Sequence, residues 1–273
     1  MKKEVKFLTA SSLFVLLFLM VSGAFDGIMH TIVYVIGFIA PVFACLYMYY
    51  GKEHGDKIFT AEYLKISRGG VVMTLALMPC AVLLTLLSSL SVTAFFALFG
   101  LESNVVIKEP PLLALLLHAV LPAVLEEAAF RYLPLRIMGG RSPRATVLVS
   151  ATLFALLHHS FYSIPYAFVA GVVLMCVALI TGSVVSSAVI HFANNALALL
   201  TMGALGVSAE PLTVIIVLAV LTLLSLALII PRGRSILSAL CESFSVKEGG
   251  ASPAVLLYLA VPSLIIAIFE IWG

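Results

Sequence analysis

Nine apolar runs of about 20 residues divide this 273-residue chain, and they constrain its fold more than any other feature. A helix needs about 20 apolar residues to cross the hydrocarbon core of a bilayer. Charged residues make up 10% of the chain, whereas a soluble domain carries about 25%. The sequence therefore predicts an all-α, polytopic transmembrane bundle with spans near 7–25, 28–50, 71–99, 112–134, 145–161, 164–181, 184–205, 211–230 and 254–272.

The basic residues of the predicted loops test this layout, because Lys and Arg accumulate on the cytoplasmic side of membrane proteins. With nine spans only Lys108 falls on the outer side, and thirteen basic residues share the other: Lys2, Lys3, Lys6, Lys52, Lys57, Lys65, Arg68, Arg136, Arg141, Arg144, Arg232, Arg234 and Lys247. This bias predicts a cytoplasmic N-terminus. A count of eight spans would break the alternation, so we favour nine.

The N-terminal run has a second interpretation. Three lysines, an apolar run and the small residues Ser22-Gly23-Ala24 are also typical of a cleaved signal peptide. Because further spans follow and need a first helix to start insertion, we expect this run to be kept as a span.

Two polar segments interrupt the apolar runs of what we predict to be a single membrane domain over residues 1–273. Segment 51–70 mixes charges with apolar residues, so it could be an interfacial helix on the cytoplasmic surface or an ordinary polar loop. Segment 231–252 contains Gly249 and Gly250 and is predicted to be a cytoplasmic linker. The long third run contains Pro79, which could kink its helix.

Two classes of function receive no support from the sequence. The four cysteines form no CxxC pair and mostly lie in apolar runs, so we expect small core residues and neither disulfides nor a thiolate zinc site. No basic run suggests binding to nucleic acid.

The stretch Leu125–Arg131 places two glutamates and an arginine inside the fourth apolar run. A charged side chain at the centre of a membrane helix costs about 2.5 kcal/mol or more, so it is rarely kept without a partner or a function. Glu127 and Arg131 are four residues apart and can pair on one helix face. Glu126 points about 100° away, lacks that partner and could serve as a general base. Alternatively, both glutamates only bond between helices or reach water at a helix end.

Polar residues also occur in two later runs. His191 and Asn195 are four residues apart in the seventh run; a histidine exchanges protons near neutral pH, and an asparagine amide can donate to an oxyanion. If His158 of the fifth run converges with them and with Glu126, the cluster could hold a water beside a base and hydrolyse an amide. Each residue could instead bond between helices, and we expect His118 to be structural. On these boundaries His158 lies deeper than Glu126, and a cavity open to the cytoplasm would reconcile the two depths.

Three motifs in this order resemble a known family. Glu126-Glu127 with Arg131, Phe154 with His158, and His191 with Asn195 are similar to the EExxxR, FxxxH and HxxxN motifs of the CAAX-protease and bacteriocin-processing family of intramembrane endopeptidases. The resemblance covers residues 112–205, which we predict to be the catalytic core, and extends to Gly171 and to the turn at 181–183. The FxxxH spacing selects His158 over its neighbour His159.

The resemblance implies a role for each motif residue. Glu126 would activate the attacking water, and His158 would hold or polarise it. His191 and Asn195 would stabilise the tetrahedral oxyanion, with Glu127 and Arg131 in supporting positions. Family members are often classed as metallopeptidases, and Glu126, His158 and His191 could supply a zinc site. Because no HExxH motif is present, we favour metal-free chemistry.

These features together predict a multi-pass intramembrane endopeptidase of the cell membrane. Its substrate could be a lipidated CAAX-like tail, a leader peptide or a membrane-embedded segment, and lipid surrounds the site. One alternative is a non-catalytic scaffold or bacteriocin-immunity protein, which would not need Glu126. Another is a proton-coupled transporter, although the sequence has no inverted repeat. The oligomeric state is not predicted.

Overall fold

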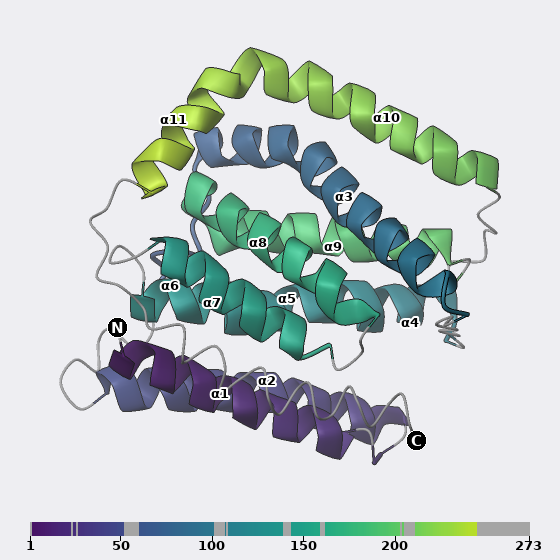
Figure 1. Ribbon diagram of the computed structural model, residues 1–273. Coiled ribbons are helices and arrows are strands. Elements are labelled where there is room, and N and C mark those ends of the chain that lie inside the picture. The colour runs from purple at the N-terminus through teal and green to yellow at the C-terminus, as the bar shows by residue number, and fades with distance from the viewer. Residues whose placement is uncertain are drawn as a thin grey trace.

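Helices account for all the regular structure in the described part of the chain (Figure 1). The computed structural model describes residues 2–22, 24–25, 27–51, 60–100, 107, 109–138, 143–158, 162–202, 204 and 211–244. The all-α, polytopic architecture predicted from the apolar runs is therefore confirmed.

The first layer is a hairpin of α1 (Lys2–Ser22) and α2 (Gly27–Tyr50), which pack along each other (Figure 1). Gly37 lets the two helices approach closely, because a Cβ atom added there would lie 2.5 Å from Cβ of Phe18. Both helices of the hairpin contact the central layer, so the hairpin forms a wall against the centre of the molecule.

The central layer begins with one long helix that is divided into five segments: α4 (Pro111–Leu115), the π turn η2 (Leu116–Val120), α5 (Leu121–Glu127), the π turn η3 (Ala128–Tyr132) and α6 (Leu133–Met138). Three helices follow and pack against it or against one another: α7 (Pro143–Leu156), α8 (Ser163–Thr181) and α9 (Val184–Thr201). Gly182 ends α8 with φ of +66°, a conformation that glycine adopts without a Cβ clash.

The outer layer on the opposite side contains α3 (Arg68–Ala97), α10 (Pro211–Ile229), the 3₁₀ turn η4 (Ile230–Arg232) and α11 (Gly233–Phe244) (Figure 1). The 30 residues of α3 extend about 45 Å at 1.5 Å per residue. Pro79 lies inside α3, and Figure 1 shows that the helix bends along its length. Proline removes a backbone donor and clashes with the preceding turn, which accounts for the predicted kink.

Eight of the nine predicted spans coincide with helices, and the ninth, 254–272, lies outside the described residues. Six described helices are long and apolar enough to cross a membrane, while Lys6–Ser22 and Pro143–Leu156 are shorter. The 14 residues of α7 extend only about 21 Å, less than the hydrocarbon thickness of about 30 Å. The membrane orientation and the count of nine spans stay predictions.

The two polar segments differ in structure. Residues 60–67 form a turn and a loop, which α9 and the long helix hold: the Val184 amide donates to the Tyr63 carbonyl at 2.8 Å, and the Tyr132 hydroxyl donates to the Thr60 carbonyl at 2.8 Å. The rest of the predicted interfacial segment, 52–59, lies outside the described residues.

The predicted linker 231–252 needs correction over its first half, because residues 233–244 form the helix α11. This helix packs against α7 and α8, and Ile236 joins an apolar cluster with α3 and α8. Apolar side chains on one face thus fold a segment that its polar composition had suggested to be irregular.

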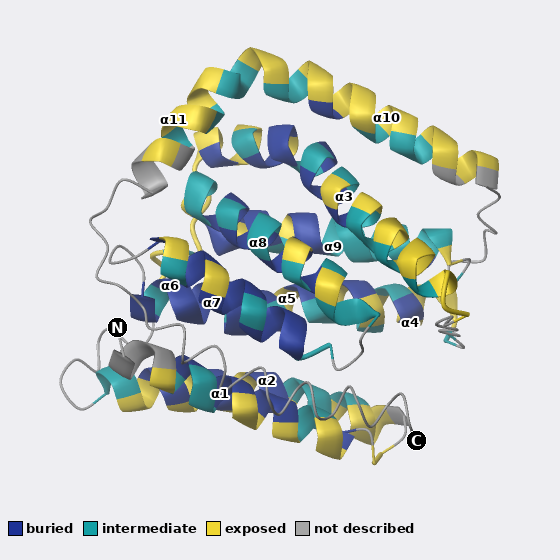
Figure 2. Ribbon diagram, in the orientation of Figure 1, coloured by how far each residue is buried: buried dark blue, intermediate teal, exposed yellow. Residues whose placement is uncertain are grey.

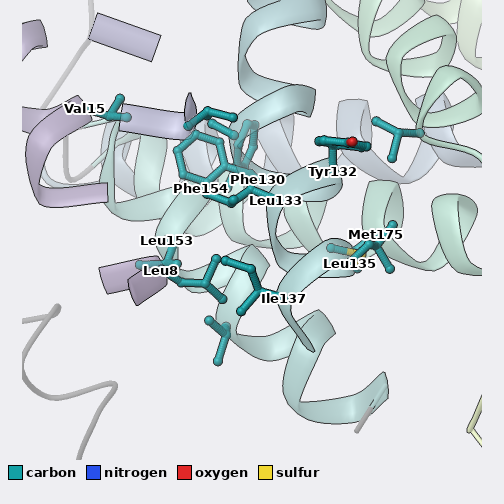
Figure 3. Close-up of a cluster of buried hydrophobic side chains, with 14 of the residues drawn as sticks. Leu8, Val15, Phe130, Tyr132, Leu133, Leu135, Ile137, Leu153, Phe154 and Met175 are labelled. Atoms are coloured by element: carbon teal, nitrogen blue, oxygen red, sulfur yellow. The ribbon is translucent and has the colours of Figure 1, made fainter. Parts of the chain in front are cut away.

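Burial is concentrated in the central layer, whereas the outward faces of α1, α2 and α10 are exposed and apolar (Figure 2). In the core, Phe130 of η3 and Phe154 of α7 lie side by side with ring centroids 5.8 Å apart (Figure 3). The exposed apolar faces are those that a bilayer would cover, and the core joins α1 and α2 to the long helix and α7.

We expect the contact between α7 and α8 to depend on Gly171. A Cβ atom there would lie 2.8 Å from Cα of Ala151, a backbone atom that can move only with its helix. The Gly171→Val variant should therefore lose about 1–3 kcal/mol of unfolding free energy, or more, through overpacking. Thermal unfolding in detergent measures the loss. Gly233→Ala is the control, because nothing lies within 4 Å of a Cβ at that position; equal stability of the two variants would contradict the prediction.

Candidate active site

The site is built on the long helix 111–138, which continues through two prolines. Pro122 and Pro134 each follow a π turn by two residues, and in each π turn a backbone amide bonds to the carbonyl five residues earlier. The wider turn accommodates a proline that cannot donate its own hydrogen bond. In the second turn, the Ser150 hydroxyl of α7 donates to the Phe130 carbonyl, four residues before Pro134. The chain therefore stays helical across the stretch that carries Glu126, Glu127 and Arg131.

Glu127 and Arg131 form the ion pair predicted from their spacing, with Nη1 of Arg131 3.1 Å from Oε1 of Glu127. Both side chains are fully buried. The guanidinium carbon of Arg131 lies 4.3 Å from the centroid of the Phe154 ring, a cation–π contact. A buried charge is tolerated when it is paired in this way, so the pair accounts for both residues inside an apolar helix.

His191 of α9 lies between the two glutamates. Its Nδ1 is 2.9 Å from Oε1 of Glu127, and its Nε2 is 3.7 Å from Oε2 of Glu126. A carboxylate oxygen paired with a guanidinium accepts hydrogen bonds, so the geometry assigns the hydrogen to Nδ1 of His191. Glu127 thus fixes the orientation of the imidazole and directs Nε2 towards Glu126. The joint role of His191 and Asn195 at an oxyanion stays a prediction.

Glu126 faces a cavity of about 290 Å³ between the α1–α2 hairpin, the long helix and α7. Its side chain is 15% exposed, in contrast to the fully buried Glu127. The Tyr34 hydroxyl of α2 donates to Oε1 of Glu126 at 3.2 Å. Tyr34 and His30 both line the cavity, and the sequence analysis had selected neither. Their separation of four residues in an apolar span was the available signal.

His158 lines the same cavity as Glu126. Its Nδ1 is 3.0 Å from the Phe154 carbonyl, which can only accept, so Nδ1 carries the hydrogen and Nε2 has a lone pair. α7 begins at Pro143, two residues before the predicted start of the fifth span, and His158 nevertheless meets Glu126 at one cavity, so the predicted difference in depth does not separate them.

Asn195 and His118 do not line the Glu126 cavity. The Asn194 amide donates to Oδ1 of Asn195 at 3.5 Å, and within the described part of the chain Asn195 does not line the cavity. His118 pairs with Glu109 at 3.6 Å, where both side chains are partly exposed. His159 lies outside the described residues.

The predicted zinc ligands Glu126, His158 and His191 do not form a metal-binding group. Among the residues with described positions, no three His, Cys, Asp or Glu side chains are arranged to hold a metal ion. Nε2 of His191 lies near Glu126, and Nδ1 of His158 contacts the Phe154 carbonyl, which leaves Nε2 of His158 available. The zinc set of Glu126, His158 and His191 stays a prediction, and the proposed reaction uses the protein's own side chains.

A second, larger cavity of about 900 Å³ lies on the Glu127 side of the long helix. Its walls are apolar side chains of α2, residues 60–64, the long helix and α9, and Glu127 is the one charged residue of the described part of the chain that lines it. The two adjacent glutamates therefore face two different cavities.

Fold and site define a multi-helix membrane protein in which Glu126 and His158 line one cavity, with His191 beside Glu126 and bonded to Glu127. Residues 108–197 match the family model described as "Type II CAAX prenyl endopeptidase Rce1-like". The match contains all three motifs and confirms the predicted resemblance to the CAAX-protease family, which is a family of membrane proteases. The helices α1, α2, α3 and α10 lie outside it. No curated protein and no solved structure matches the chain.

We expect Arg131 to stabilise the fold chiefly by compensating Glu127. Arg131→Met leaves a buried carboxylate without its cation and should cost about 3–5 kcal/mol of unfolding free energy. The double variant Glu127→Gln/Arg131→Met removes both charges and should regain a large part of that loss, because paired residues are not additive. Unfolding in mixed micelles measures both. Equal losses in the single and double variants would contradict the pairing.

Proposed function

We propose that this protein is an intramembrane endopeptidase of the cell membrane, in which Glu126 activates a water molecule for attack on a peptide bond. The observation that carries this proposal is the order of contacts from Arg131 to Glu127, from Glu127 to His191, and from His191 to Glu126. Each group lies beside the one before it, and the last carboxylate opens onto a cavity. Such an ordered series is what a positioned general base requires.

In the proposed reaction, a water in the 290 Å³ cavity gives a proton to Glu126 while its oxygen attacks the carbonyl carbon of the scissile bond. The C–N bond of the tetrahedral intermediate then breaks, and Glu126 returns the proton to the leaving nitrogen. His158 has a lone pair on Nε2, and this nitrogen can accept a hydrogen bond from the water. His191 contacts Glu127 of the buried ion pair through Nδ1, and its Nε2 lies beside Glu126.

The oxyanion role of Asn195 stays a prediction. Its amide oxygen accepts a hydrogen bond from Asn194, and Asn194 in turn accepts one from the Thr85 hydroxyl of α3. For Asn195 to donate to an oxyanion, its amide nitrogen must reach the substrate carbonyl from α9. The proposed role of Asn195 therefore requires a bound substrate.

The apolar cavity of about 900 Å³ supports a lipidated or strongly hydrophobic peptide as the substrate. It lies across the long helix from the Glu126 cavity, and one face of α2 lines both: Tyr34 and Phe38 at the first cavity, Val42 and Leu46 at the second. A substrate with a lipid or an apolar segment in the larger cavity could thus place a neighbouring peptide bond near Glu126.

We expect Glu126→Gln to lower peptide cleavage by about 10²–10⁴-fold, the usual contribution of a general acid–base group. The assay uses purified protein in detergent with farnesylated CAAX peptides, leader peptides and transmembrane peptides, and mass spectrometry of the products. Glu62→Gln is the matched control, because Glu62 is 60% exposed and pairs with Arg136 away from both cavities. Cleavage by Glu126→Gln at the wild-type rate would refute the proposed base. Absence of cleavage by the wild type across the panel would favour a scaffold.

We expect the larger cavity to select substrates by their apolar part. Val189→Trp introduces a bulky ring into the cavity and should raise KM for a farnesylated peptide several-fold, with a smaller effect on the same peptide without its lipid. Val220→Trp is the control, since Val220 lies on the exposed face of α10. Steady-state kinetics on both peptides give the comparison. An equal rise in KM for both peptides would show that the cavity does not hold the lipid.

A further inference from the structure

The α1–α2 hairpin supplies side chains to the Glu126 cavity, although it lies outside the matched residues 108–197. One face of α2 presents His30, Tyr34 and Phe38 to this cavity, at a spacing of four residues. The three motifs therefore do not enclose the site by themselves, and a wall of the cavity comes from a part of the chain that carries no motif.

The two carboxylate oxygens of Glu126 have different neighbours. Oε1 accepts a hydrogen bond from the Tyr34 hydroxyl at 3.2 Å, and Oε2 lies 3.7 Å from Nε2 of His191. These neighbours come from helices on opposite sides of the long helix, α2 and α9. Together they fix the plane of the carboxylate. A half-turn about its last bond exchanges two equivalent oxygens and restores the same contacts, so one oxygen is always bonded to Tyr34 and the other lies beside His191.

The Tyr34 ring is itself held by aromatic packing. Its centroid is 5.0 Å from that of Phe38, and Phe38 meets Phe130 of η3 edge to face at 6.3 Å. On the other side, His30 stacks on Tyr34 at 6.3 Å with an interplanar angle of 22°. Phe38 and Phe130 are both buried. The position of the Tyr34 hydroxyl is therefore set by aromatic packing against the core.

We propose that Tyr34 is a positioning residue that holds Oε1 of Glu126 and leaves Oε2, beside His191, as the oxygen that takes the proton from the attacking water. This inference rests on the proposed function of Glu126 as the base. Tyr34 acts through Glu126 and not by binding substrate, so its loss should change the rate of the chemical step.

The test compares Tyr34→Phe with Tyr50→Phe. Tyr50 lies on the same helix, its hydroxyl donates to the Arg136 carbonyl, and it lines neither cavity. Both variants lose one tyrosine hydroxyl, so a small and similar fall in unfolding temperature is expected. Only Tyr34→Phe should lower kcat, by about 10-fold or more, the range for a hydrogen bond to a charged group, with KM unchanged. Wild-type kcat in Tyr34→Phe, or a change in KM alone, would overturn the proposal.

A second comparison separates positioning from a general structural role. In Glu126→Asp the carboxylate is one methylene shorter and loses the Tyr34 hydroxyl. Adding Tyr34→Phe to this variant should then leave its residual kcat unchanged, because the contact is already absent. A structural role would produce the same fold-loss in both backgrounds, and that result would overturn the proposal.

A third measurement does not depend on proteolysis. A hydrophobic carbodiimide modifies carboxyl groups within membrane proteins, and mass spectrometry gives its rate at Glu126. Because Oε1 loses its partner, labelling of Glu126 should be faster in Tyr34→Phe than in Tyr50→Phe. Faster labelling supports the contact with Tyr34 even if the wild type cleaves no peptide, a result that would count against the protease proposal alone. It also supports the contact if Glu126→Asp has no residual activity. Equal labelling rates would overturn the contact itself.

Discussion

The buried pair of Glu127 and Arg131 is the interaction on which the rest of the site depends. A charge within an apolar helix is costly, and each of these two residues removes that cost for the other. Because Glu127 also binds Nδ1 of His191, the pair connects the long helix to α9 through a polar contact. Glu126 precedes Glu127 by one residue and faces a different cavity.

Helix continuity through the two prolines is the second constraint. Each proline follows a π turn, and the Phe130 carbonyl before Pro134 accepts a hydrogen bond from Ser150 of α7. This contact joins α7 to the long helix at the level of the core aromatics. His158 lies two residues after the end of α7 and lines the same cavity as Glu126.

The α1–α2 hairpin forms one wall of the site, although it contains none of the three motifs. The hairpin lines the smaller cavity with the polar residues Ser22, His30 and Tyr34 and with the apolar residues Leu19 and Phe38. The α2 face with Tyr34 and Phe38 continues into the larger apolar cavity. One face of α2, which lies outside residues 108–197, thus lines both the Glu126 cavity and the larger apolar cavity.

The sequence by itself determined the helical segments and the pairing of Glu127 with Arg131, because apolar length and a separation of four residues are properties of a single helix. Its three motifs also gave the resemblance to the CAAX-protease family. Only the tertiary structure decided that His191 stands between the glutamates, that Tyr34 holds Glu126, and that α11 folds where a linker was predicted. These contacts join residues that are far apart in the chain, or that fold only against neighbouring helices. Local periodicity defines which face of a helix is polar, but the packing of helices determines what that face meets.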